Sequence, residues 1–296
     1  MARDWNSRYA VLIMPELPEV ETVRRGLATV MEGRPFTRVH VMRPDLRFPL
    51  PADMADRLRG RVVTRLDRRA KYILVHCDDG TVLIIHLGMS GRMLIEPAQE
   101  RGLARSELNI GKHEHVVFEV GNGALVRFID PRRFGMMDLT DEKTLHSHKM
   151  LANLGPEPVG EDFTGEVLAE RLKGKRTPIK SALLDQRVVA GLGNIYVCEA
   201  LFMSGLSPRR LASTVQGRRA DRLARAIRDV LAAAIAAGGS TISDHVAPSG
   251  EIGYFQHSFK VYGREGEKCP GCDCDGAIRR LVQSGRSSFY CAVRQR

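Results

Sequence analysis

The stretch Met14-Pro-Glu-Leu-Pro-Glu-Val-Glu-Thr-Val-Arg-Arg-Gly-Leu27 is the most informative segment of the sequence. Apolar residues recur in and just beyond it at helical spacing, namely Val20, Val23, Leu27 and Val30. This spacing predicts an amphipathic helix from Pro18 to Met31 that ends at Gly33 and Pro35. Proline and glutamate are both favoured in a first helical turn, proline by its fixed φ and glutamate by the helix dipole. The residues alone therefore predict a helix that opens the first domain.

Short runs rich in β-branched and apolar residues follow this helix, with turn signals such as Asp79-Gly80 and Gly121-Asn122-Gly123 between them. The runs are Phe36 to Met42, Val62 to Leu66, Tyr72 to Cys77, Val82 to Leu87, Val116 to Val120 and Leu125 to Ile129. Short strands separated by such turns predict a β-sandwich or barrel with a helix attached.

The pattern changes near residue 140, and Gly155-Pro156-Glu157-Pro158 is typical of a linker into a helical second half. A helical core stripe follows, made of Leu223, Ile227, Val230, Leu231, Ala234 and Ile235. It stops at Gly238-Gly239, and a polar loop continues to about Gly253. Residues Phe259 to Arg296 indicate a small hairpin that carries cysteines.

The chain has 45 Lys and Arg against 35 Asp and Glu, which gives a net charge of +10. This balance favours a polyanionic partner such as nucleic acid, although 36 of the cations are Arg, which a GC-rich genome also produces. The longest apolar run, Val230 to Ala237, is far shorter than the ~20 residues of a membrane helix. The polar start is not a secretory signal, so we expect a cytoplasmic protein without a membrane partner.

Six motifs after the opening stretch share their order with one family. They are Lys71 in Arg-Arg-Ala-Lys-Tyr, His86-Leu-Gly-Met-Ser-Gly91, Lys112-His-Glu-His115, Asp130-Pro-Arg-Arg-Phe-Gly135, Gly191-Leu-Gly-Asn-Ile-Tyr196 and Gly285-Arg-Ser-Ser-Phe-Tyr-Cys291. From Met14 essentially to its end, the chain resembles the formamidopyrimidine-DNA glycosylases, bacterial enzymes that excise oxidised purines such as 8-oxoguanine.

This resemblance implies an α+β multidomain fold. We expect an N-terminal catalytic helix and β-sandwich over residues 14–145, and a central helix–two-turn–helix domain with a base-recognition loop over 150–258. A zinc-finger-type β-hairpin is expected over 259–296. The substrate implied is double-stranded DNA that contains oxidised purines or abasic sites, and the family expectation is a monomer on the nucleoid.

The resemblance also assigns the catalytic residues. Pro15 is the nucleophile whose amine attacks C1′ and forms an iminium, and an α-amino group suits this role because its pKa of about 7.7–8.0 leaves a neutral fraction. Glu16 moves protons. Glu19 assists that relay or is only a helix-start charge. Lys71 acts as an acid, and Arg286 contacts phosphate and contributes to the final δ-elimination.

Further positions match the DNA-binding residues of the family. Those expected at phosphates are His113, Arg132, Arg176, Lys180 and Asn194. An enzyme that everts a base also fills the hole that the base leaves, and Met89, Arg132 and Phe134 match that wedge. From the residues alone, Met89 is equally a turn residue and Phe134 a core residue.

The cysteines depart from the family pattern of two Cys-x-x-Cys pairs that hold a structural zinc. Cys77 and Cys198 stand alone, while Cys269, Cys272, Cys274 and Cys291 lie near the end of the chain. In a cytosolic chain such a cluster indicates a metal site rather than disulfides. Arg294 stands where the fourth cysteine is expected. Two hypotheses follow, a rearranged zinc site made of these four thiolates or a weakened finger without zinc.

The start of the chain also differs from the family pattern, because the 13 residues Met1 to Ile13 precede the expected initiator, Met14. An internal proline has an amide nitrogen, which is not a nucleophile. We therefore expect residues 1–13 to be missing from the mature protein, through translation from Met14 or through proteolysis, so that Pro15 becomes the first residue.

Two alternative functions stay open at this stage. One is the related endonuclease VIII type, which prefers oxidised pyrimidines, although the Pro-Glu-Leu-Pro-Glu start and Asp-Pro-Arg-Arg-Phe argue against it. The other is a non-catalytic protein that binds damaged DNA, with its nucleophile blocked by the extension.

Overall fold

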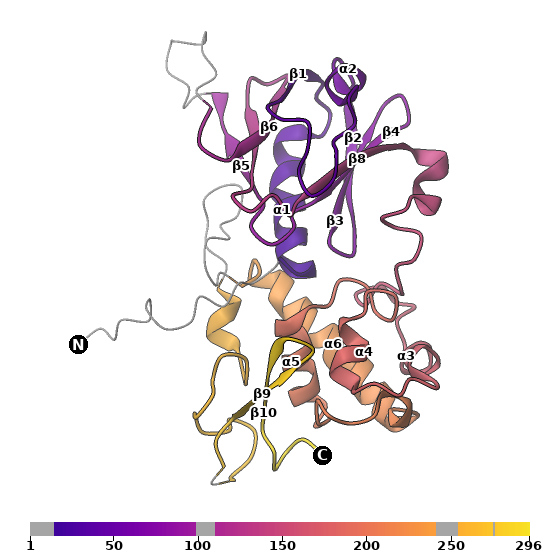
Figure 1. The fold of residues 1–296 in the computed structure, drawn as a ribbon, viewed down its shortest axis with the longest axis vertical. Coiled ribbons are helices and arrows are strands. Elements are labelled where there is room, and N and C mark those ends of the chain that lie inside the picture. The colour runs from indigo at the N-terminus through magenta and orange to yellow at the C-terminus, as the bar shows by residue number, and fades with distance from the viewer. Residues whose placement is uncertain (1–14, 99–109, 241–253, 275) are drawn as a thin grey trace, which may run out of the picture. The chain divides into compact units, whose positions relative to one another are not determined.

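The computed structural model describes residues 15–98, 110–240, 254–274 and 276–296 (Figure 1). Two compact units are present, Met1–His148 with Gly238–Tyr254 and Lys149–Ala237 with Phe255–Arg296. The expected extension 1–13, the initiator Met14 and residues 241–253 of the expected base-recognition loop lie outside the described residues. Among the described helices, none combines the length and the apolar character needed to cross a membrane.

The first unit opens with helix α1, Leu17–Met31, which confirms the helix predicted from the opening stretch. Glu16 is its N-cap and forms a capping box with Glu19, so two backbone donors of the first turn are satisfied reciprocally. The apolar stripe of the helix is buried. The helix packs against β2 (Val63–Arg69) and β3 (Tyr72–Cys77), and Figure 1 shows its course beside the strands. The amphipathic pattern therefore fixes which face of α1 meets the sheet.

Two four-stranded antiparallel sheets complete the first unit. One has the order β1-β6-β7-β5, with β1 Phe36–Val41, β6 Glu114–Val120, β7 Leu125–Ile129 and β5 Arg92–Glu96. The other has the order β2-β3-β4-β8, with β4 Thr81–His86 and β8 Met136–Asp141. The short helix α2, Met54–Leu58, and the 3₁₀ helix Glu142–Ser147 flank them. Side chains of α1 and of both sheets share one apolar core, which confirms the predicted β-sandwich with an attached helix.

The second unit is helical and carries a terminal hairpin. Its helices are α3 Gly165–Leu172, α4 Ile179–Leu184, α5 Asn194–Met203 and α6 Arg218–Ala236, with 3₁₀ turns at Ala212–Thr214 and Phe255–Ser258. The hairpin pairs β9, Arg279–Gln283, with β10, Arg286–Tyr290. The predicted stripe on α6 is buried against α3 and α5. Helix α5 is apolar on nearly every side and correspondingly buried.

The described residues directly after α6, 238–240, group with the first unit. The backbone and the hydroxyl of Ser240 both hydrogen-bond Glu19 on α1. The expected bounds of the helix–two-turn–helix domain, residues 150–258, stay a prediction.

Candidate functional site

The N-terminus of α1 brings together Pro15, Glu16 and Glu19, all of which are buried. Glu19 Oε2 accepts a 3.0 Å hydrogen bond from the Glu16 backbone nitrogen. Glu19 Oε1 accepts from the backbone nitrogen of Ser240 at 2.8 Å and from its hydroxyl at 3.0 Å. Glu19 thus holds Ser240 close to the start of α1. The Glu16 side chain accepts from the backbone nitrogen of Glu19 in the capping box, and Glu16 adjoins Pro15 in the chain.

Lys71 lies in the two-residue turn of the β2–β3 hairpin. Ala70 and Lys71 connect the paired residues Arg69 and Tyr72, and both turn residues are buried. Ala70 has a φ of +54°, which costs a residue with a Cβ about 1–2 kcal/mol. The tight turn therefore holds the backbone beside Lys71 in a strained conformation of the kind that clusters at functional sites.

His86, at the end of β4, lies near the Lys71 ammonium. Burial, together with the positive charges of Lys71 and Arg47, lowers the pKa of His86 to about 4. The ring is therefore neutral at pH 7, and its Nδ1 accepts a 3.0 Å hydrogen bond from the backbone nitrogen of Gly88. Because His86 is neutral, it adds no second positive charge beside Lys71.

An ion-pair network connects α1 to the turn that carries Lys71. The Arg68 guanidinium lies 3.1 Å from Glu21 on α1 and donates to the Ala70 carbonyl at 3.0 Å. Burial raises the pKa of Glu21, but the hydrogen bonds and charges of Arg24, Arg25 and Arg68 outweigh it, so the net pKa lies below its usual value of 4.5. The network therefore links the helix of Pro15 to the hairpin of Lys71.

The residues expected to form the wedge lie on two loops of the first unit, the 88–91 loop after β4 and the 130–135 loop between β7 and β8. Met89 is partly buried, and the Phe134 side chain is 38% exposed, which a core residue would not be. The Arg132 guanidinium lies 4.7 Å from the centre of the Phe134 ring, within cation–π distance. The structure thus presents Arg132 and Phe134 as a stacked pair.

The two loops are in direct contact. A Cβ added to Gly88 would lie 2.4 Å from the carbonyl carbon of Phe134, so only glycine allows the backbones to approach this closely. His113 is exposed at the start of β6, with a φ of +69°. Its carbonyl accepts a 3.0 Å hydrogen bond from the backbone nitrogen of Asp130, so the expected phosphate ligand adjoins the 130–135 loop.

In the second unit, Lys180 and Asn194 both reach the terminal hairpin. Lys180 Nζ donates to the Ser287 carbonyl at 2.8 Å and to the Ser288 hydroxyl at 2.7 Å. Asn194, the first residue of α5, donates through Nδ2 to the same Ser287 carbonyl at 3.0 Å. Lys180 is 0% exposed, so its ammonium supports the hairpin in this structure, and its direct contact with phosphate stays a prediction.

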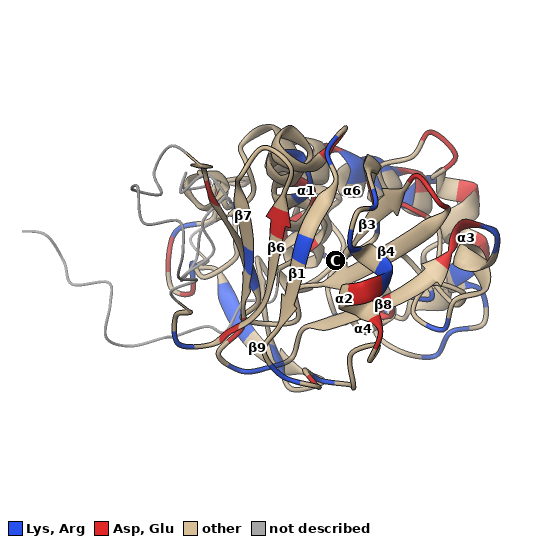
Figure 2. Ribbon diagram, turned by 90° about the horizontal axis from the view of Figure 1, so that it is seen from above, with Lys and Arg blue, Asp and Glu red and all other residues tan. Residues whose placement is uncertain are grey.

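The hairpin turn presents Arg286. Ser284 and Gly285 connect the paired residues Gln283 and Arg286 with φ values of +49° and +71°, as a type I′ turn requires. Arg286 is exposed directly after this turn, and Arg176 is exposed before α4. Figure 2 shows further Lys and Arg residues on β9 and α6. The second unit therefore combines a fixed hairpin with exposed cations that suit phosphate groups.

Sequence reasoning missed Glu199, a buried carboxylate on α5. Its oxygens accept from the three consecutive backbone nitrogens of Lys260, Val261 and Tyr262 at 2.8, 3.0 and 2.9 Å. Burial raises the pKa of Glu199, although these donors favour the charged form. A single acidic residue inside the otherwise apolar run from Ile195 to Phe202 was the available signal.

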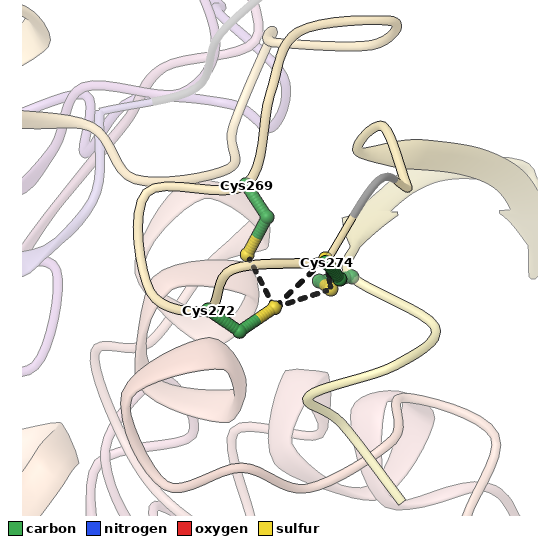
Figure 3. A group of neighbouring side chains, drawn as sticks. Cys269, Cys272 and Cys274 are labelled. Atoms are coloured by element: carbon green, nitrogen blue, oxygen red, sulfur yellow. Dashed lines mark hydrogen bonds between the residues drawn. The ribbon is translucent and has the colours of Figure 1, made fainter.

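The four C-terminal cysteines converge on one point, and Figure 3 shows the labelled Cys269, Cys272 and Cys274 pointing toward one another. All four sulfur atoms lie within 4.8 Å of one another. Cys272 Sγ lies 3.4 Å from Cys269 Sγ, 2.8 Å from Cys274 Sγ and 3.7 Å from Cys291 Sγ. Tetrahedral zinc with Zn–S bonds of about 2.3 Å separates its sulfurs by about 3.8 Å. The 3.4 and 3.7 Å separations are near this value, and the 2.8 Å separation between Cys272 and Cys274 is shorter. The four sulfurs are therefore close enough together to hold one metal ion.

Arg294 explains how the cluster tolerates the missing fourth cysteine. Its guanidinium donates to the Gly271 carbonyl at 2.6 Å and lies 5.0 Å from the centre of the Phe202 ring. Its backbone nitrogen lies 3.4 Å from Cys291 Sγ. Burial raises the pKa of Cys291, but hydrogen bonds from the backbone nitrogens of Arg294 and Val293 bring it down to about 7. Arg294 thus fastens the cysteine loop to α5, while Cys274 contributes the fourth sulfur.

Comparison with known proteins agrees with this geometry. The family model of the formamidopyrimidine-DNA glycosylase N-terminal domain matches residues 14–137, and that of the formamidopyrimidine-DNA glycosylase H2TH domain matches residues 154–246. The formamidopyrimidine-DNA glycosylase of Rhodospirillum centenum is 59% identical, over 96% of this chain and 100% of its own length. The enzyme of the same name from Ruegeria pomeroyi is 57% identical with the same coverage.

Solved structures are similar along nearly the whole chain. The MutM (Fpg) protein of Thermus thermophilus has a TM-score of 0.82 and 38% identity, and the match covers 95% of this chain and 98% of the other. The Lactococcus lactis Fpg (MutM) in complex with DNA that contains N7-benzyl-Fapy-dG has a TM-score of 0.84 and 31% identity. That match covers 95% of this chain and 99% of the other.

Proposed function

Because the chain belongs to the formamidopyrimidine-DNA glycosylase family, we propose that it removes oxidised purines from duplex DNA and cleaves the resulting abasic site. The observation that carries this proposal is the buried N-terminus of α1, where Pro15 adjoins the carboxylate of Glu16. The Lactococcus lactis relative is in complex with DNA that contains N7-benzyl-Fapy-dG, and formamidopyrimidines belong to the substrate class proposed here.

Pro15 acts as the nucleophile in the form of the chain that begins with it. Its neutral secondary amine attacks C1′ of the damaged nucleotide, the C1′–N9 bond breaks, and the purine leaves with a proton. Opening of the sugar ring then converts the adduct into an iminium, with a proton delivered to O4′. Glu16 accepts the proton of Pro15 and returns it in our proposal, the usual work of a carboxylate beside a nucleophile.

Lys71 supplies a proton during elimination. The iminium acidifies C2′, so a solvent base removes a C2′ proton, and the electron pair forms a C2′=C3′ double bond as the bond from C3′ to its oxygen breaks. Loss of the C4′ proton then breaks the bond from C5′ to its oxygen, and each phosphate leaves with the bonding electrons. Each departing phosphate is stabilised by a nearby cation. Lys71 lies in a strained turn beside the neutral His86, and this geometry supports its role as the mobile proton carrier. Arg286 binds phosphate from the hairpin of the second unit.

Met89, Arg132 and Phe134 fill the space that the everted nucleotide leaves. The contact between their two loops supports a shared entry into the duplex. His113, Arg132, Arg176, Lys180 and Asn194 stay our proposed phosphate residues, with Lys180 also fixing the hairpin of Arg286. Several such contacts make the affinity for DNA fall steeply with salt. We propose that a monomer acts on nucleoid DNA in the cytoplasm.

The four cysteines hold a structural Zn²⁺ ion, which would stabilise the loop that precedes the hairpin. Metal analysis of purified protein tests this assignment, and we expect one zinc ion per chain. The substitution Cys274→Ser should release it, whereas Cys77→Ala should not, because Cys77 is buried in the first unit and burial raises the pKa of its thiol to about 12. Full zinc content in the Cys274→Ser protein would contradict this ligand set.

Strand cleavage tests the function. A chain that begins at Pro15 is incubated with duplexes that carry 8-oxoguanine opposite cytosine or, separately, thymine glycol. We expect rapid cleavage of the first duplex and slow cleavage of the second. A preference for thymine glycol would identify an endonuclease VIII-type activity. Tight binding to an abasic duplex without cleavage would identify a non-catalytic damaged-DNA-binding protein.

A further inference from the structure

Asp130 is a fully buried carboxylate that the proposed chemistry does not use. It lies at the start of the 130–135 loop, and its Oδ2 accepts from the backbone nitrogen of Gly135 at 2.7 Å. Its Oδ1 accepts from the hydroxyl of Ser90 at 2.5 Å and from the backbone nitrogen of Arg132 at 3.3 Å. A buried carboxylate needs such donors to offset its lost hydration. Each donor belongs to one of the two loops that carry the wedge.

Ser90 completes the connection from the other side. While its hydroxyl donates to Asp130, its oxygen accepts from the backbone nitrogen of Arg132 at 3.2 Å. Ser90 directly follows Met89, and Arg132 is itself a wedge residue. The Ser90 side chain thus connects the chain next to Met89 with the backbone of Arg132.

The backbone of Asp130 is anchored in turn to the start of β6. Its nitrogen donates to the His113 carbonyl at 3.0 Å, and its carbonyl accepts from His115 Nε2 at 2.9 Å. Asp130 therefore occupies a fixed point on the sheet from which both loops are held. The strained φ of +57° at Arg133 shows that the 130–135 loop adopts a shape that requires such support.

We propose that Asp130 and Ser90 form a latch that holds the 88–91 loop and the 130–135 loop in one register, so that Met89, Arg132 and Phe134 enter the duplex as a single wedge. This inference rests on the proposed function. Both residues are positioning residues, because they act through the wedge and touch no reacting atom. A wedge displaced by about 1 Å loses much of its effect, in the way that small misplacements cost about 10²-fold in rate.

The test separates base eversion from chemistry. Excision of 8-oxoguanine requires eversion of a stacked and paired base, whereas a preformed abasic site is easier to evert. Ser90→Ala should lower 8-oxoguanine excision about 10- to 100-fold while cleavage at an abasic site falls far less. Ser90→Thr, which keeps the hydroxyl, should restore excision. The exposed Ser147 donates to the Thr144 carbonyl within its own 3₁₀ turn, and Ser147→Ala serves as the matched control.

Wedge insertion is measured directly with 2-aminopurine next to the orphaned cytosine, whose fluorescence rises as the wedge unstacks it. Ser90→Ala should reduce this rise, and Asp130→Asn should reduce it further. If Asp130→Asn fails to fold, Ser90→Ala carries the test alone, since it removes a single side-chain oxygen.

Wild-type excision and insertion by Ser90→Ala would overturn the latch. Equal loss of excision and abasic cleavage, without rescue by Ser90→Thr, would also overturn it, because that result indicates general damage to the unit. A wild-type protein that cleaves neither substrate would contradict the proposed function itself, and with it the role of the latch. These failures are distinguishable because the wild-type protein is measured on both substrates first.

Discussion

Replacement of Glu199 should unfasten the segment that leads into the hairpin of the second unit. Its carboxylate accepts from three consecutive backbone nitrogens, those of Lys260, Val261 and Tyr262. Tyr262 lies at the end of this segment, and its hydroxyl accepts from Asn194 Nδ2 at 3.4 Å. Glu199 therefore joins α5 to the segment that precedes the cysteine loop.

The magnitude follows from the number of donors. Glu199→Ala leaves three N–H groups without their acceptor, those of Val261 and Tyr262 buried and that of Lys260 partly buried, at about 1–3 kcal/mol for each buried one. Removal of the buried charge offsets part of this loss, since burial already disfavours the ionised form and raises the pKa of Glu199. We expect a net destabilisation of about 3–5 kcal/mol. Glu199→Gln keeps one oxygen for two of the donors and should cost only about 1–2 kcal/mol.

Urea unfolding monitored by circular dichroism measures these differences in the free energy of unfolding. The control is Glu170→Ala on α3, whose partner Lys173 lies 3.5 Å away with side chains 75% and 72% exposed. An exposed pair of this kind should change stability by less than about 1 kcal/mol. The affinity for abasic DNA, measured in parallel, should fall with Glu199→Ala because the hairpin of Arg286 is no longer held firmly.

A loss of less than about 1 kcal/mol for Glu199→Ala would refute the reasoning, because three orphaned donors cannot cost so little unless water replaces the carboxylate. Equal effects of Ala and Gln would also refute it. That result would mean that the shape of the side chain matters and its acceptors do not.

Three further outcomes are expected. Glu21→Gln should lower the free energy of unfolding by about 1–2 kcal/mol at pH 7. Because the folded-state pKa of Glu21 is depressed below 4.5, this difference should be present above pH 4.5 and vanish as the pH falls through the folded-state pKa. Urea unfolding at several pH values measures it. Gly88→Ala places a Cβ 2.4 Å from the Phe134 carbonyl carbon at a φ of +68°. It should lower the free energy of unfolding by at least about 2 kcal/mol and slow 8-oxoguanine excision. Unchanged excision would contradict the close contact of the loops. Arg286→Ala should reduce the slope of log Kd against log salt by about 1 in a titration and leave more of the β-elimination product uncleaved at C5′; an unchanged slope would argue against its phosphate contact.

Local patterns were enough to predict much of the fold. The apolar spacing that continues to Val30 predicted α1, because a helix that buries one face must repeat apolar residues every three to four positions. Strands β5 and β8 were absent from the predicted runs. Arg92–Glu96 begins and ends with charged residues, and Met136–Asp141 contains two acidic residues, so neither stands out as an apolar run.

The candidate site was harder to predict, because it depends on contacts between distant segments. The motifs that hold Met89 and Phe134 lie far apart in the sequence, and only the family resemblance connected them. The complete burial of Lys180 was not visible in the sequence, since a lysine is almost never fully buried unless it is paired. The sequence alone did not show that Cys274 belongs to the same cluster as the other three cysteines, and the structure places all four sulfurs together.

The central claim is that Pro15 forms a covalent intermediate with damaged DNA. Borohydride trapping on an 8-oxoguanine duplex tests it directly, with one protein that begins at Met1 and one that begins at Pro15, each checked by intact mass. Borohydride reduces the iminium and fixes the protein to the DNA. We predict an adduct only from the protein with a free Pro15 amine. An equal adduct from the uncleaved Met1 protein, or no adduct from either despite tight DNA binding, would contradict the claim.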